Sequence, residues 1–397
     1  MADLVPLRLQ LVEPGWADRV PSPAHDSMNA KERRAYLEEC PDSYFAVTRS
    51  LDDLPVGTEM TVNELLSLGR DSLDLLVEKG AFGELREPGM YVYGLDDGRH
   101  SQAGILCGSS TTDFEHGLIR AHERVFGAQR DHLAKHFEIV GSQSSPIVMA
   151  HRDNDAIDAI VTSAMQQQPL LDFVMPDGLR QRIWPLDDSL SRTVKELVAD
   201  TPLYIIDGHH RTGAAQAYLF EAGPGSADHM LTAVFPASQM RSLAFHRWLR
   251  SDDDCRWLFE GMTERFPTRT MASDELDGLH VDELAIYHRR EWTAVELPNL
   301  PDGDALSRLD PVRLQRHLLG PHVGIDESAP RSRLDYVSDK TIGQLMELVD
   351  HGSGALVLMR PIEMGALFDV ADAGQIMPPK STYFMPKARS GVVLRPL

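Results

Sequence analysis

The sequence has few cysteines, no long hydrophobic run and a deficit of basic residues. Its three cysteines, Cys40, Cys107 and Cys255, lie far apart and form no CxxC pair. This spacing argues against a disulfide scaffold or a zinc knuckle and fits a reducing cytoplasm. No run approaches the ~18 apolar residues of a membrane span, and residues 1–6 lack the features of a signal peptide. We therefore expect a soluble, cytoplasmic protein without a membrane partner.

The charge balance argues against nucleic acid as a partner, although a local basic patch could still exist. The 397 residues include 39 Lys and Arg against 60 Asp and Glu, which gives a net charge of −21. Binding to nucleic acid requires an excess of basic residues that neutralise phosphates, so we do not expect it here. The hydrophobic fraction of 42% and the charged fraction of 25% are those of an ordinary globular protein. The length allows two or three domains.

Several standard catalytic motifs are absent as well. The chain contains no GxxxxGK[ST] loop, no GxGxxG after a strand, no GxSxG elbow and no HExxH. The usual P-loop, Rossmann, α/β-hydrolase and zincin sites are therefore disfavoured.

Hydrophobic periodicity and turn residues predict a mixed α/β fold. Thr61 and Glu64 have capping-box spacing and open a helix that Gly80 ends. Further helices are expected at residues 117–137, 156–166, 212–219, 311–319 and 340–349, and strands at residues 90–94, 103–108, 145–150, 203–206, 231–235, 284–287 and 355–359. The acidic cluster at residues 252–254 suggests a boundary between a catalytic region, 1–250, and a C-terminal mixed α/β region, 251–397. Strand order cannot be derived from these patterns.

The most informative motif is Asp207-Gly208-His209-His210-Arg211, which follows an apolar strand and precedes a helix rich in small residues. Such a turn gathers backbone N–H groups and a helix N-terminus at one point, which favours an anion. Gly208 permits a tight turn, and Arg211 offers a fixed fork of donors to phosphate or carboxylate. The alternative is a solvated turn with a capping Asp207. We favour a ligand or catalytic site.

Four other clusters are weaker. His122 and Glu123 lie on the expected helix 117–137, where Glu123 could act as a general base or a metal ligand, or could simply be a surface residue. His132 and His136, spaced i,i+4, could bind a transition metal, but no third ligand is near in sequence. Two proline-bounded loops complete the set: residues 21–26, ending in His25 and Asp26, and residues 378–387, with Lys380, Ser381, Thr382, Tyr383 and Lys387.

In this order, these segments resemble the bacterial and archaeal domain-of-unknown-function family 1015 nearly from end to end. The residues that carry the resemblance are residues 21–26, 122–123, 204–211, 245–247, 379–384 and 386–387 and Gly391. The chain departs from the family pattern at Ala24-His25, His132 and Thr212. The Gly208–Arg211 turn also resembles the nucleotide-binding turn of the ParB/sulfiredoxin superfamily, which includes the free serine kinases. The resemblance implies a ParB/sulfiredoxin-like core with an additional mixed sheet and helices.

The resemblance implies that the Gly208–Arg211 turn holds a nucleotide phosphate, usually with Mg²⁺, and it does not identify the substrate. Our leading hypothesis is a kinase that transfers phosphate from ATP or ADP to the hydroxyl of free L-serine or a similar hydroxy amino acid. Gly208, His209, His210, Arg211 and Thr212 would hold the donor phosphates. Asp207 or Glu123 would be the base or the Mg²⁺ ligand, with His209 also in the catalytic set. His122, Asp26 and the residues of the 378–387 loop, chiefly Lys380 and Lys387, are secondary contacts to phosphate or substrate.

Other functions remain open at this stage. The same site could hydrolyse a nucleotide, or it could act as a ParB-like nucleotide switch or an accessory protein without a small-molecule acceptor. The sequence does not reveal the acceptor, the choice between ATP and ADP, the pathway, or whether the chain forms a homo-oligomer.

Overall fold

The computed structural model describes residues 2–55, 57–199, 201–223, 228–301, 303–326, 329–338 and 340–397. Residue contacts divide the chain into two compact units. Unit 1 comprises residues 1–121, 125–241 and 386–397, and unit 2 comprises residues 122–124 and 242–385. Both chain ends therefore belong to unit 1. None of the helices in the described ranges combines the length and the apolar character that a bilayer crossing demands.

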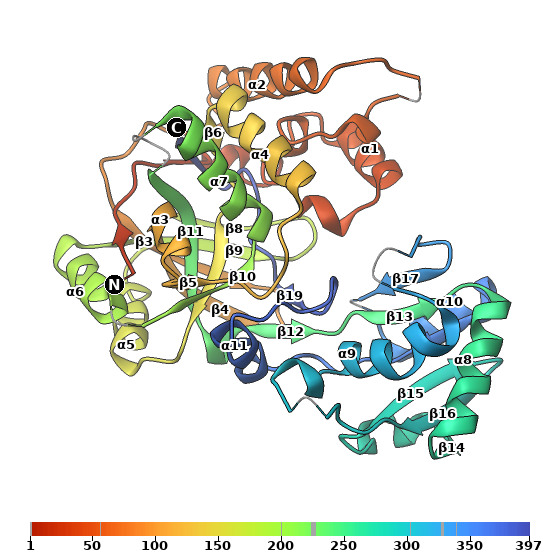
Figure 1. The fold of residues 1–397 in the computed structure, drawn as a ribbon. Helices are drawn as coiled ribbons and strands as arrows, with labels where there is room; N and C mark the ends of the chain where they lie inside the picture. The colour runs from red at the N-terminus through yellow and green to blue at the C-terminus, as the bar shows by residue number, and fades with distance from the viewer. Residues whose placement is uncertain are drawn as a thin grey trace. The chain divides into compact units, whose positions relative to one another are not determined.

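Unit 1 is built on a mixed sheet with the strand order β5-β10-β7-β11-β4-β3-β9-β8, and β1 pairs with β4 (Figure 1). β10 runs parallel to β5, and β11 runs parallel to β7, whereas the other neighbours are antiparallel. The strands are β1 (Leu4–Val5), β3 (Met90–Asp96), β4 (Ser101–Ser110), β5 (Ile119–Arg120), β7 (Ile147–His151), β8 (Leu171–Val174), β9 (Arg180–Leu186), β10 (Leu203–Asp207) and β11 (His229–Pro236). The predicted mixed α/β class is confirmed.

A second, three-stranded sheet joins the two ends of the chain. β20 (Val393–Pro396) pairs on one side with β2 (Gln10–Leu11) and on the other with β6 (Ser142–Gln143). This pairing holds the C-terminal residues 386–397 in unit 1, which matters for the position of Lys387 below.

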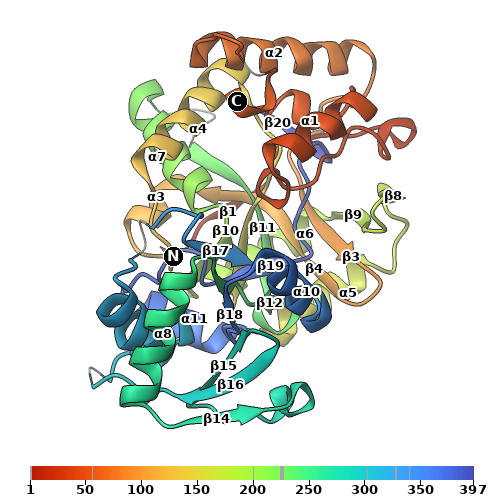
Figure 2. The ribbon, with the colours of Figure 1, turned by 90° about the vertical axis from the view of Figure 1, so that its right-hand side faces the viewer.

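The helices of unit 1 follow local signals in the sequence. The helices are α1 (Ala30–Glu39), α2 (Val62–Glu78), α3 (Thr111–Glu115), α4 (Gly127–Val140), α5 (Asp155–Ala164), α6 (Asp188–Ala199) and α7 (His209–Ala222). The capping box predicted for α2 is present, because the Glu64 side chain accepts from the Thr61 amide and the Thr61 hydroxyl accepts from the Glu64 amide. α4 packs against both α2 and α7, as Figures 1 and 2 show.

The expected helix at residues 117–137 is wrong in its first half. α3 ends at Glu115, and Gly117 then has a left-handed backbone with φ +70°. Ile119 and Arg120 form β5, which pairs with the start of β10, and α4 begins only at Gly127. The tertiary pairing of β5 with a strand about 80 residues away therefore overrides the local helical pattern. His122 and Glu123 consequently lie in a loop rather than on a helix.

Unit 2 contains a six-stranded antiparallel sheet with the order β14-β16-β15-β18-β13-β17. Figure 2 shows its neighbouring strands β15 and β16. Its strands are β13 (His246–Leu249), β14 (Thr268–Met271), β15 (Glu283–His288), β16 (Glu291–Glu296), β17 (Leu334–Val337) and β18 (Ala355–Val357). A two-stranded pair consists of β12 (Arg241–Leu243) and β19 (Tyr383–Met385). The helices are α8 (Asp252–Arg265), α9 (Asp310–Leu314), which continues as a π-helix (Gln315–Val323), α10 (Ile342–Gly352) and α11 (Met364–Asp372).

Each unit has its own apolar core. In unit 1 one large cluster includes Met149, Ile205 and Val234 from three adjacent strands. Unit 2 has two apolar clusters, and both contain residues of the six-stranded sheet. One includes Leu258, Leu318 and Val357, and the other includes Trp248 and Tyr287. The acidic residues 252–254 begin α8, and Asp254 is buried in an ion pair with Arg333, so this cluster lies inside unit 2.

Candidate functional site

The Asp207–Arg211 segment forms a sharp connection between a buried strand and a helix. β10 is buried from Leu203 to Ile206 and ends at Asp207. Gly208 then takes the left-handed region with φ +104°, and α7 begins at His209. The helix therefore starts three residues earlier than the sequence predicted. Because of this early start, the amides of His209, His210 and Arg211 point out of the helix N-terminus.

Two features favour glycine at position 208: its left-handed backbone conformation and the closeness of the Arg211 side chain. A Cβ at position 208 would lie 3.0 Å from the Nε and one Nη atom of Arg211, because the guanidinium folds back over the turn. Any side chain would therefore strain the backbone and displace Arg211.

Two cationic side chains converge on the carboxylate of Asp207. One Nη of Arg211 donates to Oδ2 of Asp207, and the other donates to the carbonyl of Pro146 at 2.9 Å. The Nζ of Lys387, which is only 10% exposed, lies 3.3 Å from Oδ1 of Asp207. Burial alone would raise the pKa of Asp207, but the charges of Lys387 and Arg211 outweigh it and hold that pKa well below its usual value of 3.8. Asp207 is therefore ionised at neutral pH.

The remaining residues of this turn fix its position. The Thr212 amide and hydroxyl both donate to the Gly208 carbonyl, at 2.9 and 3.2 Å. His210 accepts a hydrogen bond on Nε2 from the Phe126 amide at 3.2 Å and stacks on the Phe126 ring at 5.9 Å. His209 is buried at 4% exposure. Of the predicted phosphate-binding residues, Thr212 thus shapes the turn, and His210 ties it to the residue before α4.

The structure divides the predicted C-terminal loop between the two units. Lys387 lies in unit 1 beside Asp207, whereas Lys380, Ser381, Thr382 and Tyr383 lie in unit 2.

The unit 2 part of that loop is held by contacts to nearby residues. His122 Nε2 and the Thr382 hydroxyl are 3.2 Å apart, and the His122 carbonyl accepts from the Met377 amide at 2.8 Å. The Ser381 hydroxyl donates to the Pro378 carbonyl at 2.7 Å. His122, Ser381 and Thr382 therefore form one local cluster within unit 2, with the partly buried Glu123 next to His122 in the chain.

Lys380, which the sequence predicted as a contact to phosphate or substrate, has an unusual backbone conformation. Its φ of +57° is in the left-handed region, which non-glycine residues seldom adopt. Its Nζ lies 5.4 Å from the centroid of the Phe245 ring, and Tyr383 meets the same ring edge-on at 5.2 Å. The buried Arg247 donates to the carbonyls of both Phe245 and Lys380, at 2.7 and 2.9 Å. Arg247 thus fixes the backbone at Lys380.

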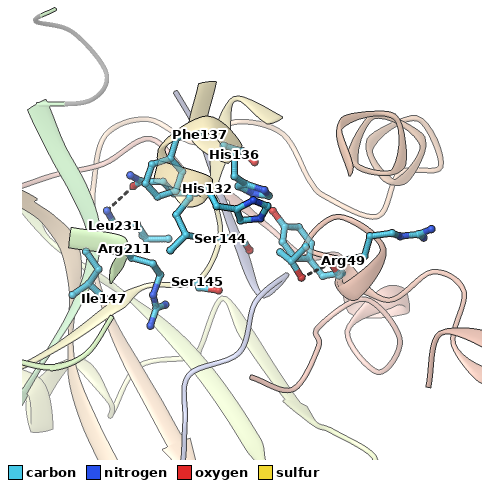
Figure 3. A pocket seen from close by; sticks show the side chains of 14 residues that line it. Arg49, His132, His136, Phe137, Ser144, Ser145, Ile147, Arg211 and Leu231 are labelled. Atoms are coloured by element: carbon cyan, nitrogen blue, oxygen red, sulfur yellow. Dashed lines mark hydrogen bonds between the residues drawn. The ribbon is translucent and has the colours of Figure 1, made fainter. Parts of the chain in front are cut away.

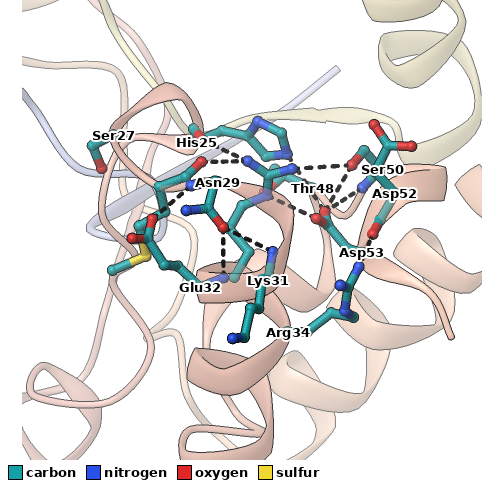
Figure 4. Close-up of polar contacts among 12 residues, drawn as sticks. His25, Ser27, Asn29, Lys31, Glu32, Arg34, Thr48, Ser50, Asp52 and Asp53 are labelled. Atoms are coloured by element: carbon teal, nitrogen blue, oxygen red, sulfur yellow. Dashed lines mark hydrogen bonds and ion pairs between the residues drawn. The ribbon is translucent and has the colours of Figure 1, made fainter. Parts of the chain in front are cut away.

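The proline-bounded loop near the N-terminus is anchored by a buried ion pair (Figure 4). Arg33 Nε donates to Asp53 at 2.8 Å, and its Nη1 donates to the carbonyls of His25 and Met28. His25 Nε2 lies 3.5 Å from the other oxygen of Asp53. The side chain of Asp26 lies outside what the structure describes, so its predicted role remains a prediction.

Sequence reasoning missed a small cavity in unit 1. Its volume is about 100 Å³. The lining comes from residues 44–49, α4, residues 142–145, β7, α7 and β11. The lining residues are Tyr44, Thr48, Arg49, His132, Leu133, His136, Phe137, Ser142, Gln143, Ser144, Ser145, Ile147, Arg211 and Leu231. The i,i+4 spacing of His132 and His136 was the available signal, because it places both rings on one face of α4.

The structure offers little support for a preformed metal centre. Within the described ranges, no three His, Cys, Asp or Glu side chains gather closely enough to hold a metal ion, so the pair His132 and His136 lacks a third ligand there. At Asp207, one carboxylate oxygen faces Lys387 and the other faces Arg211. A divalent cation on Asp207 would have to displace at least one of these cations. Asp207 therefore does not fit the role of a resident Mg²⁺ ligand in this arrangement.

Comparison with known proteins identifies the family. The model of a family described as "Protein of unknown function (DUF1015)" matches residues 6–315. That match covers well over half of the chain, and the protein belongs to this family. No curated protein matches the chain.

Some solved structures are weakly similar. A mutant free serine kinase in complex with ADP is 10% identical, with 67% of this chain and 84% of that chain covered and a TM-score of 0.36. SbnI with a C-terminal truncation, from Staphylococcus aureus, is 12% identical, with 72% and 85% covered and a TM-score of 0.40. A conserved hypothetical protein from Pyrococcus furiosus is 10% identical, with 68% and 90% covered and a TM-score of 0.34. Likenesses at these scores carry no argument about this chain.

Proposed function

We propose that this protein is a phosphotransferase that moves a phosphoryl group from ATP or ADP to the hydroxyl of a small hydroxy acid, with free serine and similar hydroxy amino acids as the first acceptors to test. One observation carries the proposal: the N-terminus of α7 follows β10 directly, with Arg211 and Lys387 beside it. Outward-pointing helix amides and two cations are the groups that phosphate oxygens require.

The cations are held in place by Asp207 but remain able to bind phosphate. A guanidinium has five N–H donors, and two of those on Arg211 are used by Pro146 and Asp207. The carboxylate thus orients Arg211 and Lys387 in the absence of ligand and keeps them from folding elsewhere. We assign Asp207 this positioning role, and Gly208, His209 and His210 the presentation of the turn to the phosphates.

The transfer step needs a proton acceptor on the substrate hydroxyl. The acceptor oxygen forms a bond to the terminal phosphorus, and the bond from that phosphorus to the bridging oxygen breaks, leaving its electron pair on the departing nucleotide. The hydroxyl proton passes to a carboxylate, for which we propose Glu123.

Mg²⁺ enters this proposal with the nucleotide and not as a resident ion. When bound to the phosphates it supplies neutralisation of their negative charge, and it commonly keeps several water ligands. The protein residues that we assign to phosphate neutralisation are Arg211, Lys387 and the α7 N-terminus.

A screen of purified protein tests the proposal. The protein is incubated with ATP or ADP and with each of a panel of hydroxy acids, including free serine, and products are analysed by mass spectrometry. We expect an acceptor-dependent phosphorylated product. Glu123→Gln should lower kcat by ~10²–10⁴-fold with nucleotide affinity unchanged, which is the range of general-base loss. Nucleotide binding without acceptor-dependent turnover would instead favour a ParB-like switch or a hydrolase.

A further inference from the structure

The cavity in unit 1 has room for one end of a small metabolite. An engineered cavity of ~150 Å³ in another protein holds benzene, which has six heavy atoms. At about 100 Å³, this cavity is smaller and admits a group of a few heavy atoms, such as the carboxylate end of a small acid, but not a whole nucleotide. Arg211 contributes to its wall and also belongs to the turn after β10, so the cavity adjoins the proposed phosphate site.

Two imidazoles form one wall of the cavity. In Figure 3 the rings of His132 and His136 lie next to each other on α4, while the guanidinium of Arg49 points away from them. Burial and the charge of His132 lower the pKa of His136 to about 4. Burial, and then the charge of His25, lowers the pKa of His132. At neutral pH each ring is uncharged and offers one N–H donor and one nitrogen acceptor.

Neither imidazole ring has a hydrogen-bond partner among the described residues. Ser144, which also lines the cavity, differs because its hydroxyl is used in two hydrogen bonds to the backbone. The Ser144 hydroxyl donates to the Val393 carbonyl and accepts from the Gly391 amide, both at 2.6 Å. The nitrogens of His132 and His136 are therefore left for a ligand or for water. This contrast marks the imidazole wall as the part of the cavity that recognises its occupant.

The charge of the lining selects between ligand classes. Arg211, which is drawn apart from the two imidazole rings in Figure 3, supplies a positive charge, and the described lining contains no Asp or Glu. A carboxylate in this cavity would be attracted by Arg211 and hydrogen-bonded by the imidazoles. An ammonium group would lose its water without gaining an anionic partner, which is unfavourable.

We propose that this cavity is part of the acceptor subsite and that it takes the carboxylate end of a small hydroxy acid without an α-ammonium group. This inference rests on the proposed phosphotransfer and narrows its acceptor class. His132 and His136 bind the polar end of the acid, and Arg211 lies between this subsite and the phosphates. Glycerate is the suitable probe because it carries a hydroxyl where serine carries its ammonium group.

The test compares glycerate and serine as ligands by isothermal titration calorimetry of the full-length protein, with and without saturating ADP. We expect glycerate to bind at least tenfold more tightly than serine. His136→Phe, which fills the cavity and removes the polar atoms, should weaken glycerate binding by more than tenfold. His136→Gln, which keeps a donor and an acceptor, should weaken it less. Gln129→Phe, at an exposed position of the same helix, is the matched control and should leave binding unchanged.

The outcomes separate this inference from the proposed function. If ADP binds but glycerate does not, or if serine binds as tightly as glycerate, the acceptor assignment is overturned while nucleotide binding stands. If glycerate binds in a His136-dependent way but neither ADP nor ATP binds, the cavity assignment stands and the phosphotransferase proposal fails. Glycerate affinity equal in His136→Phe, His136→Gln and Gln129→Phe would overturn the cavity as the binding site, even if all variants fold normally.

Discussion

Two arginines in this protein are used in opposite ways. In unit 1, Arg211 faces the carboxylate of Asp207, and 22% of its side chain is exposed. In unit 2, Arg247 is 4% exposed and donates to the carbonyls of Phe245 and Lys380. A guanidinium that binds backbone carbonyls in the interior holds its own chain, whereas one that shares an accessible carboxylate can exchange it for a ligand. Both sequence motifs contain an arginine next to a histidine, so only the structure separates the two roles.

The largest effect should come from Arg247. Replacing it in Arg247→Met leaves two carbonyls without their donor, and each such loss costs ~1–3 kcal/mol. We expect the free energy of unfolding to fall by about 2–4 kcal/mol, measured by urea denaturation. Arg247→Lys, which keeps the charge but not the fork of donors, should recover only part of it. A loss under 1 kcal/mol in Arg247→Met would contradict the structural role.

The matched change in unit 1 should alter binding more than stability. In Arg211→Ala, we expect nucleotide affinity to fall by about 1.5–3 kcal/mol, because a charge-assisted contact is lost. The ion pair with Asp207 is partly exposed, so the free energy of unfolding should change by ~1 kcal/mol or less. Calorimetry with ADP and urea denaturation measure the two quantities on the same sample. Unchanged ADP affinity would remove Arg211 from the phosphate site.

The sequence predicted the local part of this comparison and missed the long-range part. The strand before Asp207, the turn at Gly208 and the following helix were recognisable because hydrophobicity, a glycine and small residues lie next to one another. The meeting of Asp207 with Lys387 depends on β20 pairing with β2 and β6, which no local pattern encodes. The same limit explains the wrong helix at residues 117–126, where β5 pairs with β10. The cavity was missed because its lining comes from several separate segments.

Acid should weaken unit 2 through His246. Burial, and then the charge of Arg247, lowers the pKa of His246 to about 4, and its Nδ1 accepts the Met359 amide at 3.1 Å, which requires a neutral ring. Because the folded pKa lies below the unfolded value near 6.5, the stabilisation is complete above pH 6.5 and is lost as the pH falls towards 4. A shift of this size corresponds to ~3 kcal/mol for a fully buried ring. We expect about 1–2 kcal/mol because the ring is partly exposed.

The variant His246→Gln tests that pH dependence. Its amide oxygen can accept the Met359 hydrogen bond, and it does not titrate. The difference in unfolding free energy between pH 6.5 and pH 4 should therefore be smaller in His246→Gln than in the natural protein, as measured by urea denaturation at several pH values. Equal differences in the two proteins would show that His246 does not control this range.

The smallest effect concerns the lysines, and it sharpens the comparison of the two units. Lys380 has φ +57°, which costs a non-glycine residue ~1–2 kcal/mol, whereas glycine adopts it freely at an entropic cost of ~0.5–1 kcal/mol. Lys380→Gly should therefore stabilise the protein by less than about 1 kcal/mol relative to Lys380→Ala, which loses the same charge but keeps the strain.

Both variants should retain ADP affinity if the phosphate site uses Lys387, which lies 3.3 Å from Asp207. Lys387→Ala should then lower ADP affinity while both Lys380 variants do not. Weaker ADP binding in Lys380→Gly and Lys380→Ala alike would assign Lys380 to the phosphates and would remove the distinction between the two units.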